Sequence, residues 1–482
     1  MMHPLEPSVP SIDQMVAVTN PVVTDLNLCI TASQQSAWLY VKLRNEEDLT
    51  AEDLVVVDVR VGGLPPPTGL KLLWESRPGG IWVLRSKFSN NIDEAVTEVD
   101  VLFGLDAVDP RPEWTLGQLP LQLNAQKYIP VARLTVLHGR VKSRREDRPI
   151  LRADADNKFK ITQISDTHMV TGLESREADP LTTAFVGQVL DVEKPHLVVY
   201  TGDQLHHDVL DSRSALFKVV APAIERKIPF AAVFGNHDSE GEHASSRAEQ
   251  MSMYQNLPLS LCEPGPEEID GIGNYHLQIL APASSQLSSA NLYFLDSHGQ
   301  ISGKLFGSHY DHIKKSQIEW FLKERSTHWQ DRSNRDLSIT FFHIPLPEFQ
   351  DPRLVIRGGC RREPTEGPNR NSHFYDALVE GHISAVSCGH DHVNDFCPLL
   401  RPDGKAFLSG PWLCYGGGSG FGGYCSYGRE RFHRRIRSYE IDMNTNSLKT
   451  WLRVEYGSER VDETVLMENG VTAYDPKHIT TL

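Results

Sequence analysis

Five short segments rich in metal-binding side chains each follow a run of residues with strand character. These segments are residues 166–168, 202–203, 235–238, 343 and 389–392, which read Asp-Thr-His, Gly-Asp, Gly-Asn-His-Asp, His and Gly-His-Asp-His. In open α/β sheets, ligands bind at the edge where the carboxyl ends of the parallel strands meet. A chain with this order is therefore expected to fold so that the five segments converge on one site.

Residues 158–456 alternate between strand-like and helix-like patterns. Strand-like runs include 160–164, 197–200, 230–234, 292–295, 338–342 and 383–387, with amphipathic helical patterns at 181–193, 212–226, 316–329 and 374–380. This alternation predicts sheets covered by helices, which is an α/β fold. Runs at 435–443 and 448–456 predict a closing hairpin, and residues 457–482 are expected to form a C-terminal tail.

The N-terminal quarter of the chain has a different pattern. After an expected disordered start at 1–10, residues 11–137 carry short β-branched runs broken by Pro, Gly and Asn, which predicts a smaller all-β domain. Matching runs recur roughly every forty residues, a period at which internal repeats are worth considering. The layout resembles the three-fold β-prism domains of some membrane-trafficking proteins, and a plain β-sandwich fits about equally well. Residues 138–157 are expected to form a charged linker.

Composition narrows the possible functions. The formal net charge of −15 argues against nucleic acid as the main partner, because a phosphate backbone requires fields of Lys and Arg. The basic runs 140–148 and 429–437 are interpreted as charged linker and solvated strand edge. The chain has 7 Cys and no CxxC pair, which favours a reduced chain over a disulfide framework.

The sequence also gives expectations about location. The N-terminus lacks a basic segment followed by an apolar core, so no signal peptide is expected. No stretch is long and apolar enough to predict a membrane span. We therefore expect an intracellular, cytoplasmic protein, and the sequence leaves its oligomeric state open.

The spacing of the polar side chains within these segments suits metal binding. Asp166 and His168 lie two positions apart, so an extended backbone points both to one side, and His390 and His392 repeat this arrangement. Asp203 follows a Gly at another strand end, where one carboxylate could bridge two ions. The segments therefore predict a site for a pair of metal ions.

Two further donors and a candidate acid complete the predicted site. Asn236 offers a neutral carbonyl oxygen, and His343 a further imidazole. Oxygen and imidazole donors without thiolate suit two divalent ions of Mn, Fe or Zn, and Mg also fits. Such ions lower the pKa of a bridging water, so that hydroxide attacks phosphorus. His237 is the candidate general acid for the leaving group, and Asp238 is expected to orient its ring.

The order DxH, GD, GNHD, H and GHDH resembles the calcineurin-like metallophosphoesterase superfamily over residues 158–456. Residues 201–205, 235–241 and 389–397 are similar to the fungal dose-dependent cell-cycle-regulator phosphatases and the plant purple-acid-phosphatase-like proteins. The resemblance implies a four-layer α/β/β/α sandwich. It also implies one ion held by Asp166, His168, Asp203 and His392, and a second held by Asp203, Asn236, His343 and His390.

One difference from a related group bears on the metals. True purple acid phosphatases resemble this chain but have Gly where His168 stands and a Tyr ligand where His206 stands. A Tyr-to-iron charge-transfer colour is therefore not expected, and two divalent ions are favoured over a ferric ion. His206 is a candidate for contacting substrate, and the alternative is an exposed loop histidine.

Two other stretches are candidates for binding substrate. The glycine-rich run 415–424 includes Gly417, Gly418 and Ser419, whose backbone could approach substrate closely, and the alternative is a flexible turn. Arg361 and Arg362 precede a predicted helix, where a guanidinium could hold a phosphate through two hydrogen bonds. The alternative for the arginines is a solvated charged loop.

Three functions fit this sequence. The leading prediction is a metal-dependent phosphatase that hydrolyses phosphomonoesters, either phosphoproteins or small phosphoesters. The second is a phosphodiesterase for small diesters, because the acidic charge disfavours only long nucleic acids. The third is a non-catalytic metal-binding scaffold. Some superfamily members have lost ligands and act as binding subunits, which predicts gaps in the ligand set, and this sequence has none.

Overall fold

The computed structural model describes residues 2–4, 20–30, 37–67, 73–123, 131–140, 148–171, 175–282, 288–303, 307–328, 337–400 and 410–473. Within these residues the chain divides into two compact units. One unit spans 1–146, 170–177 and 209–221, and the other spans 147–169, 178–208 and 222–482. Most of the expected disordered start and part of the expected linker lie outside the described residues.

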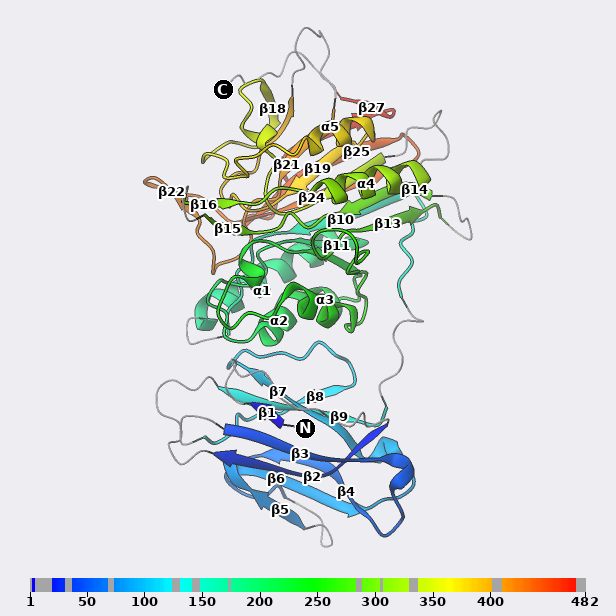
Figure 1. Cartoon of the computed structure of the whole chain (residues 1–482), viewed down its shortest axis with the longest axis vertical. Coiled ribbons are helices and arrows are strands. Elements are labelled where there is room, and N and C mark those ends of the chain that lie inside the picture. The colour runs from blue at the N-terminus through cyan, green and yellow to red at the C-terminus, as the bar shows by residue number, and fades with distance from the viewer. Residues whose placement is uncertain are drawn as a thin grey trace. The chain divides into compact units, whose positions relative to one another are not determined.

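The first unit is built from three antiparallel sheets of three strands each (Figure 1). The sheets have the orders β1-β3-β2, β4-β6-β5 and β7-β9-β8. The strands are β1 (Met2–Pro4), β2 (Pro21–Ile30), β3 (Ala37–Asn45), β4 (Leu54–Val61), β5 (Trp74–Arg77), β6 (Ile81–Lys87), β7 (Val96–Phe103), β8 (Trp114–Leu116) and β9 (Ala132–His138). Short 3₁₀ turns lie at η1 (Glu46–Asp48), η2 (Pro78–Gly80) and η3 (Ile92–Glu94).

One apolar core holds the three sheets together. It includes Leu28 of the first sheet, Val59 of the second and Val101 of the third, all buried. Alternating residues put one face of each strand into this core. The repeat seen in the sequence corresponds to the three successive three-stranded sheets. The three-sheet arrangement matches the β-prism-like alternative and corrects the plain sandwich, which would have two sheets.

The second unit contains two larger sheets. The first is seven-stranded in the order β12-β11-β10-β24-β25-β26-β27, and the second is five-stranded in the order β13-β14-β17-β19-β21. The strands of the first are β10 (Lys158–Ile164), β11 (Leu197–Thr201), β12 (Phe230–Val233), β24 (Arg435–Asp442), β25 (Ser447–Val454), β26 (Val461–Glu468) and β27 (Val471–Thr472). Those of the second are β13 (Tyr275–Leu280), β14 (Ser288–Phe294), β17 (Leu337–Phe341), β19 (Ala385–Cys388) and β21 (Trp412–Tyr415).

The strand directions explain why side chains from both sheets reach one place. Strands β10, β11 and β12 run parallel, and so do β14, β17, β19 and β21. The sheets share a core in which Ile161 and Val199 of one lie in the same apolar cluster as Phe341 of the other. The loops at the carboxyl ends of both parallel sets are therefore the natural position for a site.

Helices cover the sheets of this unit. They are α1 (Ser175–Glu193), α3 (Arg247–Gln255), α4 (Lys315–His328) and α5 (Phe374–Glu380). Most of α2 (Ser212–Glu225) belongs to the first unit, which includes residues 209–221. Phe321 of α4 and Leu378 of α5 join Tyr293 of the five-stranded sheet in a second core. Figure 1 shows α1 and α3 beside β11 of the other sheet. The predicted mixed α/β class is therefore confirmed.

Two predicted boundaries of this unit are corrected. Residues 148–157, expected to be linker, contribute Leu151 to the core between the sheets, and Arg152 forms a bridge with Leu280. Residues 461–472, expected to be tail, form β26 and β27 beside β25, with Leu466 fully buried. Both segments are rich in charged residues, which masks the few apolar side chains that fix them in the fold.

The cysteines correct a further expectation. Cys397 on β20 (Cys397–Leu400) forms a disulfide with Cys414 on β21, their Cα atoms 4.2 Å apart. Both residues are completely buried in the core between the sheets. The odd number of cysteines therefore conceals one disulfide, because the pairing depends on neighbouring strands rather than on spacing in the sequence.

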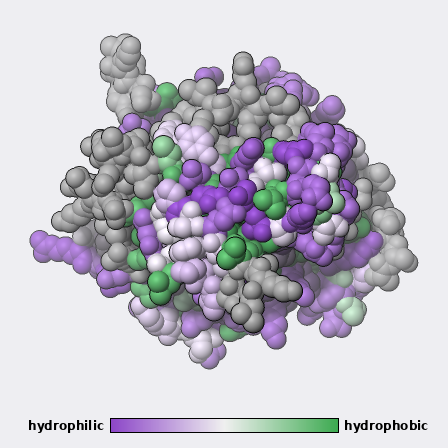
Figure 2. All heavy atoms as spheres, turned by 90° about the horizontal axis from the view of Figure 1, so that it is seen from below, coloured by the Kyte–Doolittle hydropathy of each residue, from purple (hydrophilic) through white to green (hydrophobic). Residues whose placement is uncertain are grey.

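The remaining strands and turns lie in the connecting segments. They are β15 (Gln300–Gly303), β16 (Gly307–Tyr310), β18 (Leu354–Gly358), β22 (Ser426–Tyr427), β23 (Glu430–Arg431), η5 (His237–Ser239) and η6 (Pro347–Gln350). The face seen in Figure 2 is mainly hydrophilic, with hydrophobic residues in small scattered groups, as is ordinary for a surface that faces water. Among the described residues, none of the helices combines the length and apolar character needed to cross a bilayer.

The disulfide gives a direct test of this fold. Alkylation of the unfolded chain without reductant should modify Cys29, Cys262, Cys360, Cys388 and Cys425. After reduction, all 7 Cys should be modified. Peptide mass spectrometry distinguishes the two states. Modification of Cys397 and Cys414 in the unreduced sample would contradict the pairing.

Candidate metal centre

All seven predicted ligands follow strands of the two sheets. Those after the seven-stranded sheet's β10, β11 and β12 are Asp166, His168, Asp203 and Asn236. Those after the five-stranded sheet's β17 and β19 are His343, His390 and His392. All seven residues are buried. The fold therefore brings together side chains that are separated by more than half of the second unit's length in sequence.

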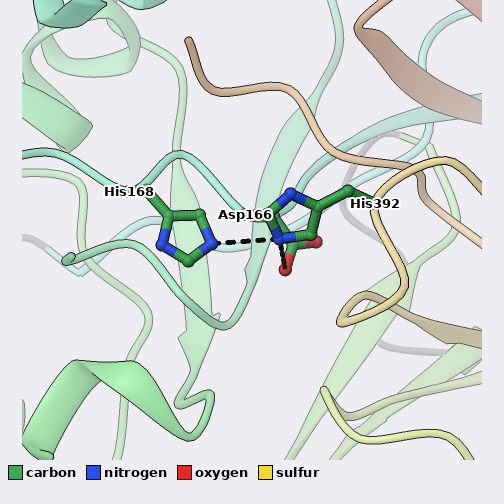
Figure 3. Close-up of side chains that lie close together, drawn as sticks. All are labelled: Asp166, His168 and His392. Atoms are coloured by element: carbon green, nitrogen blue, oxygen red, sulfur yellow. Dashed lines mark hydrogen bonds and ion pairs between the residues drawn. The ribbon is translucent and has the colours of Figure 1, made fainter. Parts of the chain in front are cut away.

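Asp166, His168 and His392 form the first ligand group (Figure 3). The Nε2 atoms of the two histidines are 3.1 Å apart, and His392 Nε2 is 3.5 Å from Asp166 Oδ1. The three side chains point toward one another, so their donor atoms face a common point. This is the arrangement of ligands around one cation.

Asp203, His343 and His390 form the second ligand group. His343 Nε2 is 3.2 Å from Asp203 Oδ2. The same oxygen is 3.8 Å from Nε2 of His168, a member of the first group. Asp203 therefore lies between the two groups, where its carboxylate can serve both.

Asn236 fits a metal role for a different reason. Its Oδ1 is buried and has no hydrogen-bond partner within the described part of the chain. An unsatisfied buried carbonyl costs free energy, on the order of 1–3 kcal/mol, and a cation would recover it. The donor set of carboxylate, amide oxygen and imidazole also fits Mn, Fe, Zn or Mg.

The backbone at several ligands adopts the left-handed conformation. The φ angles are 56° at Asp166, 46° at His168, 51° at Asp203 and 79° at His390. This conformation is unfavourable for residues with a Cβ and persists only where surrounding contacts enforce it. Such strain is common at functional sites, because it aims side chains in directions that a regular strand cannot.

Burial sets the protonation of the ligands. It raises the pKa of Asp166 to about 7 and lowers that of His392 to about 4. Burial likewise holds the pKa values of His168 and His390 well below the usual range. Burial also disfavours charge on His343, but Asp203 and Asp166 raise its pKa to about 9. Three imidazoles are therefore kept neutral, which is the form that binds metal.

His237 lies beside this centre and is oriented by an unpredicted residue. Its Nε2 is 3.9 Å from Asp203 Oδ2, and its Nδ1 is 2.5 Å from Glu240 Oε2. Asp238, expected to orient the ring, instead accepts hydrogen bonds from the backbone N–H groups of Asp203, Gly235 and Leu205. This corrects the role of Asp238, which holds two ligand loops together.

The two arginines predicted to hold a phosphate form hydrogen bonds with the protein itself. Arg361 donates to the carbonyl of Phe349, 2.7 Å away. Arg362 donates to the carbonyl of Val393 and forms an ion pair with Asp395 at 2.5 Å. Both guanidinium groups are thus bound to the protein itself. Arg362 supports the segment that follows His392, and a phosphate contact for either arginine stays a prediction.

The glycine-rich run packs closely against the loops that carry the candidate ligands. A Cβ on Gly418 would lie 2.9 Å from the Cβ of His392, and one on Gly417 would lie 2.3 Å from Arg435 Cγ. Ser419 donates its hydroxyl to the carbonyl of Ser165, 2.6 Å away. Glycine at position 418 is needed for close packing against the loop that carries His392. A substrate contact for Gly417, Gly418 and Ser419 stays a prediction.

His206 is the last predicted site residue. Its ring lies 5.9 Å from that of His168, edge to face, and 4.1 Å from that of His207. His206 is half-buried. Its ring contact with His168 places it beside the first ligand group. A substrate contact for His206 stays a prediction.

Two important residues were missed by sequence reasoning. Glu240 follows His237 by three positions in a helical turn, a spacing that brings side chains together. This spacing could have identified it. Tyr424 stacks on His392 with ring centroids 3.9 Å apart. Nothing local reveals that contact, because the two residues lie on loops after different strands.

Comparison with known proteins agrees with this geometry. A family model described as calcineurin-like phosphoesterase matches residues 159–394. Phosphatase DCR2 of Saccharomyces cerevisiae is 37% identical over 399 residues, covering 78% of this chain and 67% of the yeast protein. A protein of Arabidopsis thaliana named probable inactive purple acid phosphatase 29 is 38% identical over 343 residues, covering 63% of this chain and 84% of the plant protein.

Solved structures add little to these relatives. Purple acid phosphatase PPD1 from yellow lupin seeds aligns with a TM-score of 0.43 at 11% identity, over 82% of this chain and 68% of that chain. Because this TM-score is low, the family of the chain is assigned from the sequence relatives and the family model alone. From them, this chain belongs to the calcineurin-like phosphoesterase family.

Proposed function

We propose that this protein is a phosphatase that uses two divalent metal ions to hydrolyse phosphomonoesters, either phosphoproteins or small phosphoesters. The observation that carries the proposal is the pair of ligand groups that share Asp203. Family membership supports metal-dependent hydrolysis of a phosphoester. The donor set favours Mn, Fe or Zn, and Mg also fits.

The chain's own residues have distinct roles in this proposal. The first ion would be held by Asp166, His168 and His392, the second by Asn236, His343 and His390, with Asp203 shared. When bound, the ions would activate a water and neutralise charge on the phosphoryl oxygens.

His237 is the candidate donor of the proton that the leaving group needs. Its Nδ1 is bound to Glu240, which keeps the proton on Nδ1 and directs Nε2 toward Asp203 and the centre. In the imidazolium form, which carries a second proton on Nε2, His237 could give that proton to the leaving oxygen. Glu240 would also stabilise the charged imidazolium form of His237.

Two other functions are kept as alternatives. A phosphodiesterase for small diesters would use the same ions. A non-catalytic scaffold is suggested by the word "inactive" in the name of the plant relative. The ligand set and His237 together favour catalysis, because a scaffold has no need of a proton donor.

The expected cytoplasmic location also stays a proposal. Disulfides are rare in the reducing cytosol, so the buried Cys397–Cys414 pair weighs against it. Microscopy of a tagged full-length chain would decide between the cytoplasm and an oxidising compartment.

The function is tested by comparing two substrates with purified protein. Turnover of p-nitrophenyl phosphate and of bis-p-nitrophenyl phosphate is measured with and without Mn²⁺. Faster, Mn²⁺-dependent hydrolysis of the monoester supports the proposal, and diester preference supports the first alternative. If metal-loaded protein hydrolyses neither compound nor a phosphopeptide panel, the scaffold reading replaces the proposal.

Asp203→Asn should weaken the binding of both ions, because one carboxylate serves both ligand groups. Metal content after dialysis, measured by elemental analysis, should fall below one ion per chain. Asp376→Asn is the matched control, since that side chain is 75% exposed on α5. Two retained ions in Asp203→Asn would show that this residue does not bridge.

His237→Ala should leave metal content unchanged and slow the reaction according to the leaving group. An alkyl phosphate should lose about 100-fold in kcat, and p-nitrophenyl phosphate much less, because its leaving group needs little protonation. His373→Ala, 76% exposed, serves as control. Loss of the metals in His237→Ala would mean that this histidine is a ligand instead.

Glu240→Gln should reproduce the His237→Ala pattern in weaker form. Glutamine can still accept the Nδ1 proton but cannot stabilise a charged ring, so the loss should again be larger for alkyl phosphates. Metal content should stay at the wild-type value. Equal losses for good and poor leaving groups would remove Glu240 from this role.

A further inference from the structure

Tyr424 contacts the metal ligand His392 through three separate parts. The two rings stack at 3.9 Å with planes 9° apart. The carbonyl oxygen of Tyr424 lies 2.9 Å from His392 Nδ1, and its hydroxyl accepts a hydrogen bond from the His392 backbone N–H at 3.1 Å. One residue therefore fixes the plane, the rotation and the backbone of this ligand.

The carbonyl contact also selects the tautomer of His392. A carbonyl oxygen can only accept a hydrogen bond, so Nδ1 must carry the proton. The lone pair is then on Nε2, the atom 3.1 Å from His168 Nε2 and 3.5 Å from Asp166 Oδ1. Tyr424 thus presents the metal-binding nitrogen of His392 to the rest of the first ligand group.

Tyr424 is itself held by a buried carboxylate. Its hydroxyl donates to Glu363, whose two carboxylate oxygens are each 3.0 Å away. Glu363 also accepts a hydrogen bond from the backbone N–H of Val393 at 2.9 Å. The Asn394 side chain bonds the backbone of Glu363 in turn. The tether therefore runs from Tyr424 back to the residues directly after His392.

The other histidine of the same segment is held differently. His390 meets Tyr310 edge to face, with centroids 4.5 Å apart, and its backbone N–H donates to Asp166. Tyr310 gives His390 a ring contact, whereas Tyr424 gives His392 a stack and two hydrogen bonds. Loss of Tyr424 should therefore affect one ligand group more than the other.

We infer that Tyr424 and Glu363 form a clamp that positions His392 and sets the affinity of the first ligand group for its ion. The inference rests on the proposed two-metal function. Tyr424 is a positioning residue, because it acts through His392 and not on substrate. The segment that precedes it, Gly422-Gly423, has no side chains that could do this work, and a Cβ on Gly423 would lie 2.5 Å from the His392 ring.

The test uses the full chain and Mn²⁺ as the probe. Calorimetric titration and elemental analysis should give two ions for the wild type. In Tyr424→Ala one of the two should bind at least tenfold more weakly, as is typical when a residue supporting a ligand is lost. Both variants keep the backbone carbonyl, and Tyr424→Phe also keeps the stack and loses only the hydroxyl tether, so its effect should be smaller and in the same direction.

A matched control lies three residues further on. Tyr427 is 47% exposed and Tyr424 46%, and Tyr427 lies in the exposed strand β22. Tyr427→Ala should bind both ions like the wild type. Circular dichroism and thermal melting establish that each variant is folded, and Tyr424→Phe keeps the test valid if Tyr424→Ala is not.

A second measurement needs no metal and separates this inference from the proposed function. In metal-free protein with ¹⁵N-labelled histidine, the NMR signals of His392 are identified by their absence in His392→Asn. They should report a proton on Nδ1 in the wild type and Tyr427→Ala. Tyr424→Ala keeps the backbone carbonyl but loses the stack and the hydroxyl tether that hold it in place, so a mixture of tautomers is expected there.

The outcomes are distinct. A wild-type chain that binds two ions, with Tyr424→Ala unchanged in both affinity and tautomer, overturns the clamp and leaves the proposed function standing. A wild-type chain that holds fewer than two ions overturns the proposed function, and the affinity part of the clamp with it. Equal weakening of both ions in Tyr424→Ala would also contradict the inference, because the contacts described for Tyr424 reach only His392 among the candidate ligands.

Discussion

The candidate metal centre depends on the contacts that the buried carboxylate of Asp203 makes with residues from both sheets. One oxygen accepts the backbone N–H of His237, and the other lies within 4 Å of imidazole nitrogens on His168, His237 and His343. Burial disfavours its charge, yet these rings, with His343 foremost, keep its pKa well below the usual range. The two sheets must pack face to face for this to occur, because the contacting histidines follow strands of both.

Much of the second unit could be predicted from periodicity alone. The helix at 374–380 has the predicted limits, and the strands after which the ligands lie were all anticipated. The errors fall where few apolar residues do the packing, as with Leu151 and Leu466. In the first unit the repeat length is compatible with three similar sheets, but only the strand pairing in the structure distinguishes three sheets from two.

The convergence of the candidate ligands could be predicted from their residue types and from their positions directly after strands. The roles of the supporting residues could not. Arg362 bonds Val393 across 31 positions and Ser419 bonds Ser165 across 254. Polar residues near a predicted site suggest substrate binding. Arg362 and Ser419 form hydrogen bonds with backbone carbonyls of buried residues, where polar groups are generally hydrogen-bonded. The correction of Asp238 follows the same logic.

The close packing of the glycine run limits which residues these positions can hold. At Gly420 a Cβ would meet the carbonyl oxygen of Thr167 at 2.0 Å, and at Gly422 that of His168 at 2.3 Å. Those positions are closed to every other residue because the ligand loops already fill the space. Evolutionary constancy along this run would look like that of a substrate-binding motif, although its cause is steric. Glycines beside a candidate metal centre can therefore be required by the close packing of its loops rather than by contacts with a substrate.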